Sequence, residues 1–183
     1  MKNQILASFL VMLSGATNLL GIPGIVDGPR LSPVNNHTYY LLQSSTWSQA
    51  EMEATVLGGH LATIRNNAEN DWVYDTFGSH VQSGTLGLWI GLNDIAVEGN
   101  FVWSSGEPVI YTNWDVGQPD NMDGSEDCAH IWLDPVRGLR KWNDYHDDPW
   151  HFRVQGVVEV VPEPATLLLF GLGGVLMRKR KEF

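Results

Sequence analysis

Residues 118–128 have the sequence QPDNMDGSEDC, which combines acidic side chains with residues that favour turns. They end a longer segment, residues 104–128, that consists mostly of Gly, Pro, Asn, Asp and Ser. This composition predicts a long loop instead of a helix or strand, and long ordered loops are usually functional. Carboxylate and amide oxygens are also the ligands that calcium prefers in proteins. We therefore expect this loop to carry function, with calcium as a candidate ligand.

An EF-hand is the first alternative to consider for the segment Asp120 to Gly124. The EF-hand calcium loop needs an acidic residue at its first position, Gly at its sixth and Glu at its twelfth. With Gly124 at the sixth position, the first falls on Pro119 and the twelfth on His130. Neither side chain is a carboxylate, so the sequence excludes an EF-hand.

Length and charge restrict what the whole chain can do. The chain has 183 residues, of which 43% are hydrophobic, and this suits one globular domain with a core. Lys and Arg number 11 against 21 Asp and Glu, so the formal net charge is −10. Nucleic-acid phosphate repels such a protein, so nucleic acid is not an expected partner. Calcium, neutral glycans or basic proteins suit this charge better.

Two helices are predicted before the loop. Thr46 with Gln49 three residues later forms a capping box for the first helix. Asn66 with Glu69 begins the second, which runs to about Phe77. Apolar runs that are too short for helices predict strands at residues 38–42, 88–92, 101–103, 129–133 and 154–160.

Five short motifs occur in a fixed order along the chain. They are Trp89-Ile90-Gly91-Leu92, Gln118-Pro119-Asp120, Glu126-Asp127-Cys128, Trp142-Asn143-Asp144 and a last strand that ends in Val158-Glu159. In this order, and after two helices, they resemble the C-type lectin-like domain over residues 36–160. The resemblance implies an α+β fold in which two helices flank antiparallel sheets and a long loop binds calcium. We place the domain at residues 37–160.

The resemblance assigns the calcium ligands to five positions of this chain. They supply three carboxylates and two amides, a formal charge of −3 against the +2 of the ion, and calcium takes six to eight oxygens. In the family, two neighbouring sugar hydroxyls complete the calcium shell and hydrogen-bond to the same side chains. The alternative is a solvated acidic loop without an ion. The five positions are Gln118, Asp120, Glu126, Asn143 and Asp144.

A second calcium position is predicted beside the first. Asp94 and Glu98 lie four residues apart after the Trp89 to Leu92 strand, as in lectin domains with auxiliary sites. The resemblance adds Asn121 and the shared Glu126 as partners. Asn121 stands where those domains often carry Asp, so we expect weak binding. The alternative is a pair of surface acids on a turn.

The order Gln-Pro-Asp is the version that the family uses with galactose-type ligands, whereas Glu-Pro-Asn goes with mannose-type ligands. Carbohydrate is therefore the expected partner, with a galactose-type sugar as the hypothesis. Galactose-type sites usually add a Trp just after this motif, and here that position holds Met122. Tyr145, His146 and Trp150 are alternative stacking platforms or ordinary packing residues.

Two other functions are alternatives to a lectin. A matrix or adhesion protein could use the same fold to bind protein, ice or mineral, and Met122 motivates this alternative. A hydrolase is not expected, because the sequence has no nucleophile elbow, zincin helix or paired-carboxylate signature.

The single cysteine sets this chain apart from vertebrate lectin domains. Ala54 and Val158 occupy positions where those domains place cysteines. The cysteine that those domains carry a few residues after Asp144 is also missing, replaced by His146, Asp147 or a near neighbour, which leaves Cys128 without a partner. Cys128 is expected to be a small buried apolar residue, and an intermolecular disulfide or a reactive thiol is the alternative. The absence of two disulfide bridges lowers the unfolding free energy by several kcal/mol, so metal binding is expected to matter more for folding.

The N-terminus has the pattern of a secretory signal peptide over residues 1–16. Lys2 precedes an apolar run at residues 5–13, and Ser14-Gly15-Ala16 offers small residues for cleavage. A buried N-terminal strand is the alternative. Residues 17–36 are predicted to be a linker, because their second part contains several Gly and Pro and no apolar period.

The C-terminal segment, residues 161–183, contains Val161-Pro162-Glu163-Pro164, then 165–177 without a charge, then the basic run 178–181. This arrangement resembles the PEP-CTERM sorting signal of Gram-negative bacteria that secrete exopolysaccharide. The resemblance implies removal by a membrane exosortase and a product that is secreted or held in the cell envelope. A helix of this length spans about 20 Å of a hydrocarbon core of about 30 Å. Membrane contact is therefore expected only through this segment before processing, with a single-pass anchor as the alternative.

Overall fold

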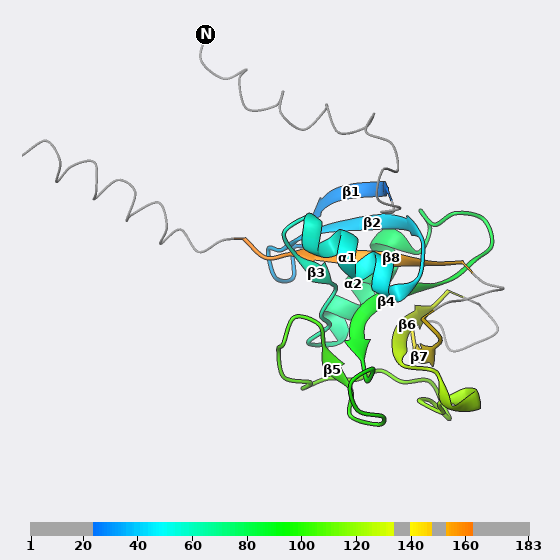
Figure 1. Ribbon diagram of the computed structural model, residues 1–183. Coiled ribbons are helices and arrows are strands. Elements are labelled where there is room, and N and C mark those ends of the chain that lie inside the picture. Colours follow the sequence, from blue (N-terminus) through cyan, green and yellow to red (C-terminus); the bar gives the residue numbers. More distant parts are fainter. Residues whose placement is uncertain (1–23, 134–139, 148–152, 163–183) are drawn as a thin grey trace, which may run out of the picture.

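A computed structural model of the chain describes residues 24–133, 140–147 and 153–162. The predicted signal peptide and the sorting signal from Glu163 onward lie outside the described residues. The described residues form eight strands, two α-helices and one short 3-10 helix (Figure 1). The strands are β1 (Ile25–Leu31), β2 (Thr38–Ser44), β3 (His60–Leu61), β4 (Thr85–Asn93), β5 (Val102–Trp103), β6 (Cys128–Trp132), β7 (Trp142–Tyr145) and β8 (Arg153–Val160), and the helices are α1 (Trp47–Val56), α2 (Asn67–Phe77) and η1 (Met122–Gly124).

The strands belong to one sheet with the order β1-β2-β8-β4-β6-β7, and β3 and β5 pair with β8 and β4. The pairs are antiparallel except for β4 and β8, which run parallel. The predicted α+β fold with two helices is confirmed, and the parallel pair is the difference from the expected antiparallel sheets. The chain makes a long excursion between these two strands, which allows it to re-enter the sheet in the same direction.

The two helices cover opposite faces of the sheet. Val157 of β8 belongs to the apolar cluster that contains Phe77 of α2, whereas the next residue, Val158, belongs to the cluster that contains Trp47 of α1. Successive side chains of a strand point to opposite faces, so the two clusters are two separate cores. A Cβ at Gly156 would lie 2.8 Å from the Cβ of Ala50, so glycine lets α1 pack closely on β8.

Both helices begin where the sequence predicts. The Thr46 hydroxyl accepts the N–H of Gln49 at 3.1 Å, and the Gln49 side chain accepts the N–H of Thr46 at 3.4 Å. The Asn66 side chain accepts the N–H of Glu69 at 3.0 Å. These bonds satisfy N–H groups that have no partner within the helix.

The linker prediction is wrong for Ile25–Leu31, which form β1 and pair with β2. Most side chains of β1 are exposed, so the strand has no apolar period for a sequence pattern to detect. Its pairing depends on backbone hydrogen bonds, and irregular register accommodates Gly28 and Pro29 at the edge of the sheet. The chain between Ser104 and Cys128 is the expected long loop, with η1 as its one short helical turn.

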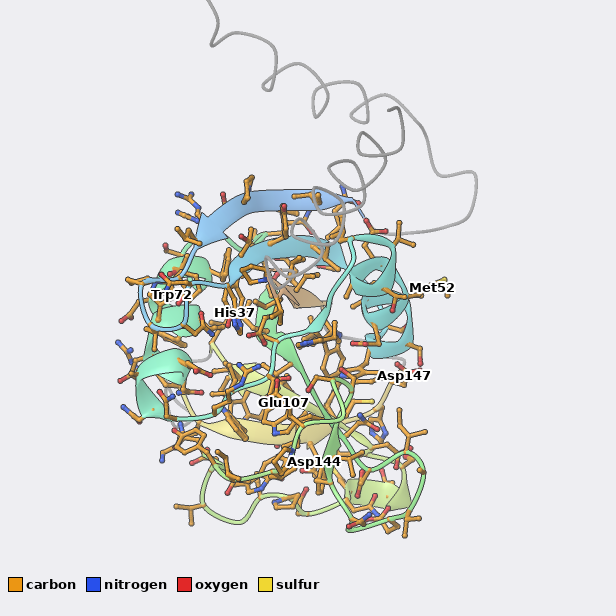
Figure 2. All side chains as sticks on the ribbon, turned by 90° about the vertical axis from the view of Figure 1, so that its left-hand side faces the viewer. His37, Met52, Trp72, Glu107, Asp144 and Asp147 are labelled. Carbon is orange, nitrogen blue, oxygen red and sulfur yellow. The ribbon has the colours of Figure 1, made fainter. Side chains whose placement is uncertain are left out.

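A buried polar network fastens the end of β8. The Glu159 side chain is 0% exposed and accepts hydrogen bonds from Arg65 at 2.9 Å and from the Tyr39 hydroxyl at 3.0 Å. His37 Nδ1 lies 2.5 Å from the same carboxylate, and Arg65 also pairs with Glu107 at 2.5 Å. Figure 2 shows His37 and Glu107 on the side of the molecule that faces the viewer. The network links β8, β2 and the loop after β5, next to Val158, which stands where the vertebrate domains mentioned above have a cysteine.

Candidate functional site

Three carboxylates converge where the long loop meets strand β7. Asp120 and Glu126 flank η1 in the loop, and Asp144 belongs to β7. One oxygen of each carboxylate lies within 4.8 Å of the others, although Asp120 is exposed and the other two are buried. Figure 1 shows η1 at one end of the molecule, and Figure 2 shows Asp144 toward the same end. Three like charges so close together favour a bound cation.

Backbone N–H groups of the loop hold two of these carboxylates in place. The two Asp144 oxygens accept the N–H groups of Asp120 at 3.2 Å and Asn121 at 2.8 Å. Glu126 accepts the N–H of Met122 at 2.9 Å, and its own N–H donates to the Asn121 side-chain oxygen at 3.1 Å. These bonds therefore fasten the loop to Glu126 within it and to Asp144 of β7.

The electrostatics of the cluster favour neutralisation of Glu126. Burial, with a further contribution from the charges of Asp144 and Asp120, raises the pKa of this carboxyl to about 7. A proton relieves this charge at low pH, and a divalent cation would relieve it at neutral pH. The site thus has the charge that a calcium ion would compensate.

The two amides of the predicted ligand set lie beside the carboxylates in sequence. The Gln118 side-chain oxygen is buried and has no hydrogen-bond partner, and the peptide bond between Gln118 and Pro119 is cis. Buried acceptors without partners are rare, and a metal ligand is one explanation. Asn143 is buried in β7, and its amide nitrogen donates to the carbonyl of Asp144. These amide and carboxylate oxygens form a donor set that fits calcium.

Of the predicted auxiliary residues, Glu126 belongs to the three-carboxylate cluster, whereas Asp94 and Glu98 do not. Asp94 is buried, with one oxygen unpaired and the other accepting the N–H of Gly99 at 2.7 Å. Burial and the charges of Glu98 and Asp127 raise the pKa of the Asp94 carboxyl. Glu98 is exposed. The side-chain oxygen of Asn121, the remaining partner, accepts the N–H of Glu126.

The family model for the lectin C-type domain matches residues 43–151, which is more than half of the chain. The chain belongs to the C-type lectin family. The domain of this family is a non-enzymatic carbohydrate-binding fold, in agreement with the expectation from the sequence that the protein is not a hydrolase. C-type lectin domains generally bind calcium, and the acidic cluster described above lies within the matched residues.

Relatives and solved structures agree with this assignment. The alpha-N-acetylgalactosamine-specific lectin of Patiria pectinifera is 43% identical over 60% of this chain and 67% of its own length. The C-type lectin mannose-binding isoform of Oxyuranus scutellatus is 34% identical over 61% of this chain and 71% of its own. The C-type lectin CEL-I from Cucumaria echinata has a TM-score of 0.61 at 26% identity, covering 75% of this chain and 94% of that one. The carbohydrate-recognition domain of the mouse scavenger receptor C-type lectin has a TM-score of 0.60 at 28% identity, covering 75% and 99%.

The sorting signal at the C-terminus also matches a family model. The model for the PEP-CTERM protein-sorting motif matches residues 160–181, and the motif implies bacterial secretion or sorting to the cell envelope. Val161 and Pro162 follow β8, whereas Glu163, Pro164 and the apolar run lie outside the described residues. Within the described part of the chain, we find no helix with the length and apolar character that crossing a membrane requires.

The lectin domain places one apolar and one aromatic side chain beside the acidic cluster. Met122 is 57% exposed. His146 is partly exposed, its Nε2 lies 3.8 Å from Glu126, and its ring lies 5.3 Å from that of Tyr145 between centroids. His146 Nδ1 also lies 2.9 Å from the hydroxyl of Ser125. Trp150, the third predicted platform, lies outside the described residues.

Sequence reasoning did not find the contact of Asp147 with the start of α1. The Asp147 carboxylate accepts the N–H of Ser48 at 2.7 Å and its hydroxyl at 2.6 Å. Figure 2 shows Asp147 beside α1. These bonds join the start of α1 to the chain just after Asp144. The two residues are far apart in sequence, so no local pattern could have revealed the contact.

Proposed function

We propose that this lectin domain binds calcium through Gln118, Asp120, Glu126, Asn143 and Asp144, and binds sugar hydroxyls through the ion. The convergence of the Asp120, Glu126 and Asp144 oxygens within 4.8 Å is the observation that carries the proposal. The unpaired oxygen of Gln118 supports it, because calcium would supply the missing partner. Two adjacent hydroxyls would complete the calcium shell and hydrogen-bond to the same side chains.

A galactose-type ligand is the favoured sugar class. The order Gln118-Pro119-Asp120 supports it, and so does 43% identity to a lectin whose name gives alpha-N-acetylgalactosamine as its specificity. Met122, partly exposed beside the site, would offer an apolar contact to the sugar ring in place of an aromatic residue.

An auxiliary calcium ion bound by Asp94, Glu98, Asn121 and Glu126 is part of the same proposal. The unpaired oxygen of buried Asp94 supports it, as does the raised pKa of the Asp94 carboxyl, which comes mainly from burial and in part from the charge of Glu98. Asn121 would have to share its oxygen with the Glu126 N–H, which agrees with weak binding.

The site of action that we propose is the outside of a bacterial cell. An exosortase would act on Val161-Pro162-Glu163-Pro164 and release the domain to the medium or the envelope, where exopolysaccharide and cell-surface glycans are available ligands. In Figure 1, β8 ends on the opposite side of the molecule from η1. A domain still attached through its C-terminus could therefore present the calcium loop away from the attachment point.

Calcium binding is tested by calorimetric titration and by thermal unfolding with calcium or chelator. Calcium should raise the melting temperature of the parent, because a ligand that binds only the folded protein stabilises it. Asp120→Asn should weaken the effect. Asp123→Asn is the matched control, since it removes the same charge from the same loop at a left-handed position that Asn tolerates. A parent protein that calcium leaves unchanged would refute the metal site.

Sugar binding is tested by retention on immobilised galactose and N-acetylgalactosamine, with immobilised mannose for comparison. We expect retention on the galactose-type matrices and elution by chelator. Preferential retention on mannose would contradict the sugar class while leaving the calcium site intact. A calcium-loaded protein that binds no sugar on a broad glycan array would contradict the lectin function itself.

Adhesion to a protein or surface without sugar recognition is the second candidate function. Met122 in place of a stacking aromatic residue favours it, as do Val116 and Ile110 on the same loop, which are 99% and 73% exposed. Binding to envelope material that persists in the presence of free galactose and chelator would support this function over the first.

A further inference from the structure

His130 lies directly behind one of the proposed calcium ligands, and the inference below rests on the proposed function. It pairs with Asn143 across the antiparallel strands β6 and β7. Its side chain is almost completely buried, and its Nε2 atom lies 3.3 Å from the amide nitrogen of Asn143. The other ring nitrogen, Nδ1, has no hydrogen-bond partner. The imidazole of His130 therefore forms its side-chain hydrogen bond with the amide of Asn143.

The neighbours of Asn143 decide which end of its amide faces the site. The amide nitrogen contacts the backbone carbonyl of Asp144, which can only accept a hydrogen bond. The nitrogen must therefore stay on this side, and its second hydrogen points at His130. Nε2 of His130 has to be the unprotonated acceptor, because a proton there would oppose the N–H of the amide. The Oδ1 atom of Asn143 is left as the end that can bind a metal.

The imidazole ring has little freedom to move away from Asn143. A Cβ at Gly87 would lie 2.0 Å from His130 Nδ1, so the ring occupies space that only a glycine on β4 leaves open. The ring also makes edge contacts with Trp132, Trp89 and Tyr145, with centroids 4.6, 5.7 and 5.7 Å apart. Glycine on one side and three aromatic rings around it hold the imidazole in one orientation.

We propose that His130 is a positioning residue for calcium binding, acting through Asn143. In its neutral form with the proton on Nδ1, it accepts a hydrogen bond from the Asn143 amide and keeps Oδ1 directed toward the ion. Residues behind metal ligands commonly act in this way, and their loss typically weakens metal affinity about 10-fold to 100-fold. The affinity for sugar would fall as well, because the sugar hydroxyls bind the ion that Asn143 helps to hold.

Calcium titration of two His130 variants tests the proposal. His130→Phe keeps a ring within the aromatic surroundings and removes the acceptor, so it should bind calcium about tenfold more weakly, with a calcium-free melting temperature close to that of the parent. His130→Gln offers a side-chain oxygen that can accept from Asn143 and should recover part of the affinity. Nitrogen NMR of the calcium-free parent should show an unprotonated Nε2 and a protonated Nδ1 on His130.

The outcomes separate this inference from the proposed function. A parent that binds no calcium overturns the proposed function and this inference with it. A parent that binds calcium while His130→Phe binds equally tightly overturns the inference alone. The same holds if both variants lose calcium affinity only in proportion to a lower calcium-free melting temperature, because that pattern belongs to a structural role. A protonated Nε2 in the NMR experiment also overturns it.

Discussion

Raising the pH of the calcium-free protein from about 4.5 to about 8 should destabilise it through Glu126. Burial raises the pKa of this carboxyl from its ordinary 4.5 to about 7. A carboxyl whose pKa is higher in the folded than in the unfolded protein contributes stability that is complete below the unfolded pKa and is lost as the pH rises through the folded pKa. The pKa difference of about 2.5 corresponds to about 3 kcal/mol of unfolding free energy, at about 1.4 kcal/mol for each whole step in pKa.

Calcium should cancel this pH dependence. The ion binds the ionised carboxylates of Asp120, Glu126 and Asp144, and protons compete with it for the same oxygens. Calcium affinity therefore rises as Glu126 loses its proton, and the stabilisation by bound calcium rises with it. This gain offsets the loss in the calcium-free protein, so the stability of the calcium-loaded protein should change little over the pH range in which the calcium-free protein is destabilised.

Urea denaturation followed by tryptophan fluorescence gives the unfolding free energy. Measurements at several pH values, once with chelator and once with calcium, give its pH dependence for the calcium-free and the calcium-loaded protein. Glu126→Gln is the matched control, because the amide has nearly the same size and cannot ionise. The difference in unfolding free energy between this variant and the parent isolates the contribution of Glu126, since the other buried carboxyls are common to both proteins. At the upper end of the pH range, the chelated variant should exceed the parent by about 3 kcal/mol. A chelated parent that follows the variant at every pH would refute the reasoning.

Three further predictions concern residues outside the calcium site. Arg65→Met should lower the unfolding free energy by about 3–5 kcal/mol, because it leaves the fully buried Glu159 carboxylate without the Arg65 guanidinium. Arg140→Met is the control, because it removes exposed ion pairs and should lower the unfolding free energy by less than about 1 kcal/mol. Equal effects of the two substitutions in urea denaturation would contradict this prediction. The Cys128 thiol is buried, and burial raises its pKa, so a disulfide reagent should label it only upon unfolding, and rapid labelling of the folded protein would contradict its burial. Asp147→Ala should lower stability by about 1 kcal/mol through loss of its hydrogen bonds to the first turn of α1, and an unchanged denaturation midpoint would show that these bonds contribute nothing.

The sequence predicts the helices well because their ends depend on local chemistry. Thr46 with Gln49, and Asn66 with Glu69, are capping pairs within one helical turn, and the structure contains the bonds they predict. Strand β1 cannot be predicted in this way, because an exposed edge strand is held by backbone hydrogen bonds to a partner strand and needs no apolar side chains.

The candidate site is predictable in part for the same reason. Asp120 and Glu126 are brought together by a short turn, so their proximity follows from local sequence. Asp144 joins them through the pairing of β6 with β7, and the motif resemblance captures its position without explaining it. His130 behind Asn143, and Asp147 beside α1, depend on register and on contacts between distant segments. No local periodicity encodes these contacts, so they become visible only in the folded structure.

The way the loop is closed bears on how much calcium can contribute. The N–H groups of Asp120, Asn121 and Met122 hold the carboxylates of Asp144 and Glu126. Much of the ordering that calcium would require is therefore supplied by the protein, which reduces the conformational entropy lost on binding. The same bonds cannot neutralise the buried charge, as the raised pKa of Glu126 shows. Calcium binding should therefore draw its free energy mainly from charge neutralisation, with little of it spent on folding the loop.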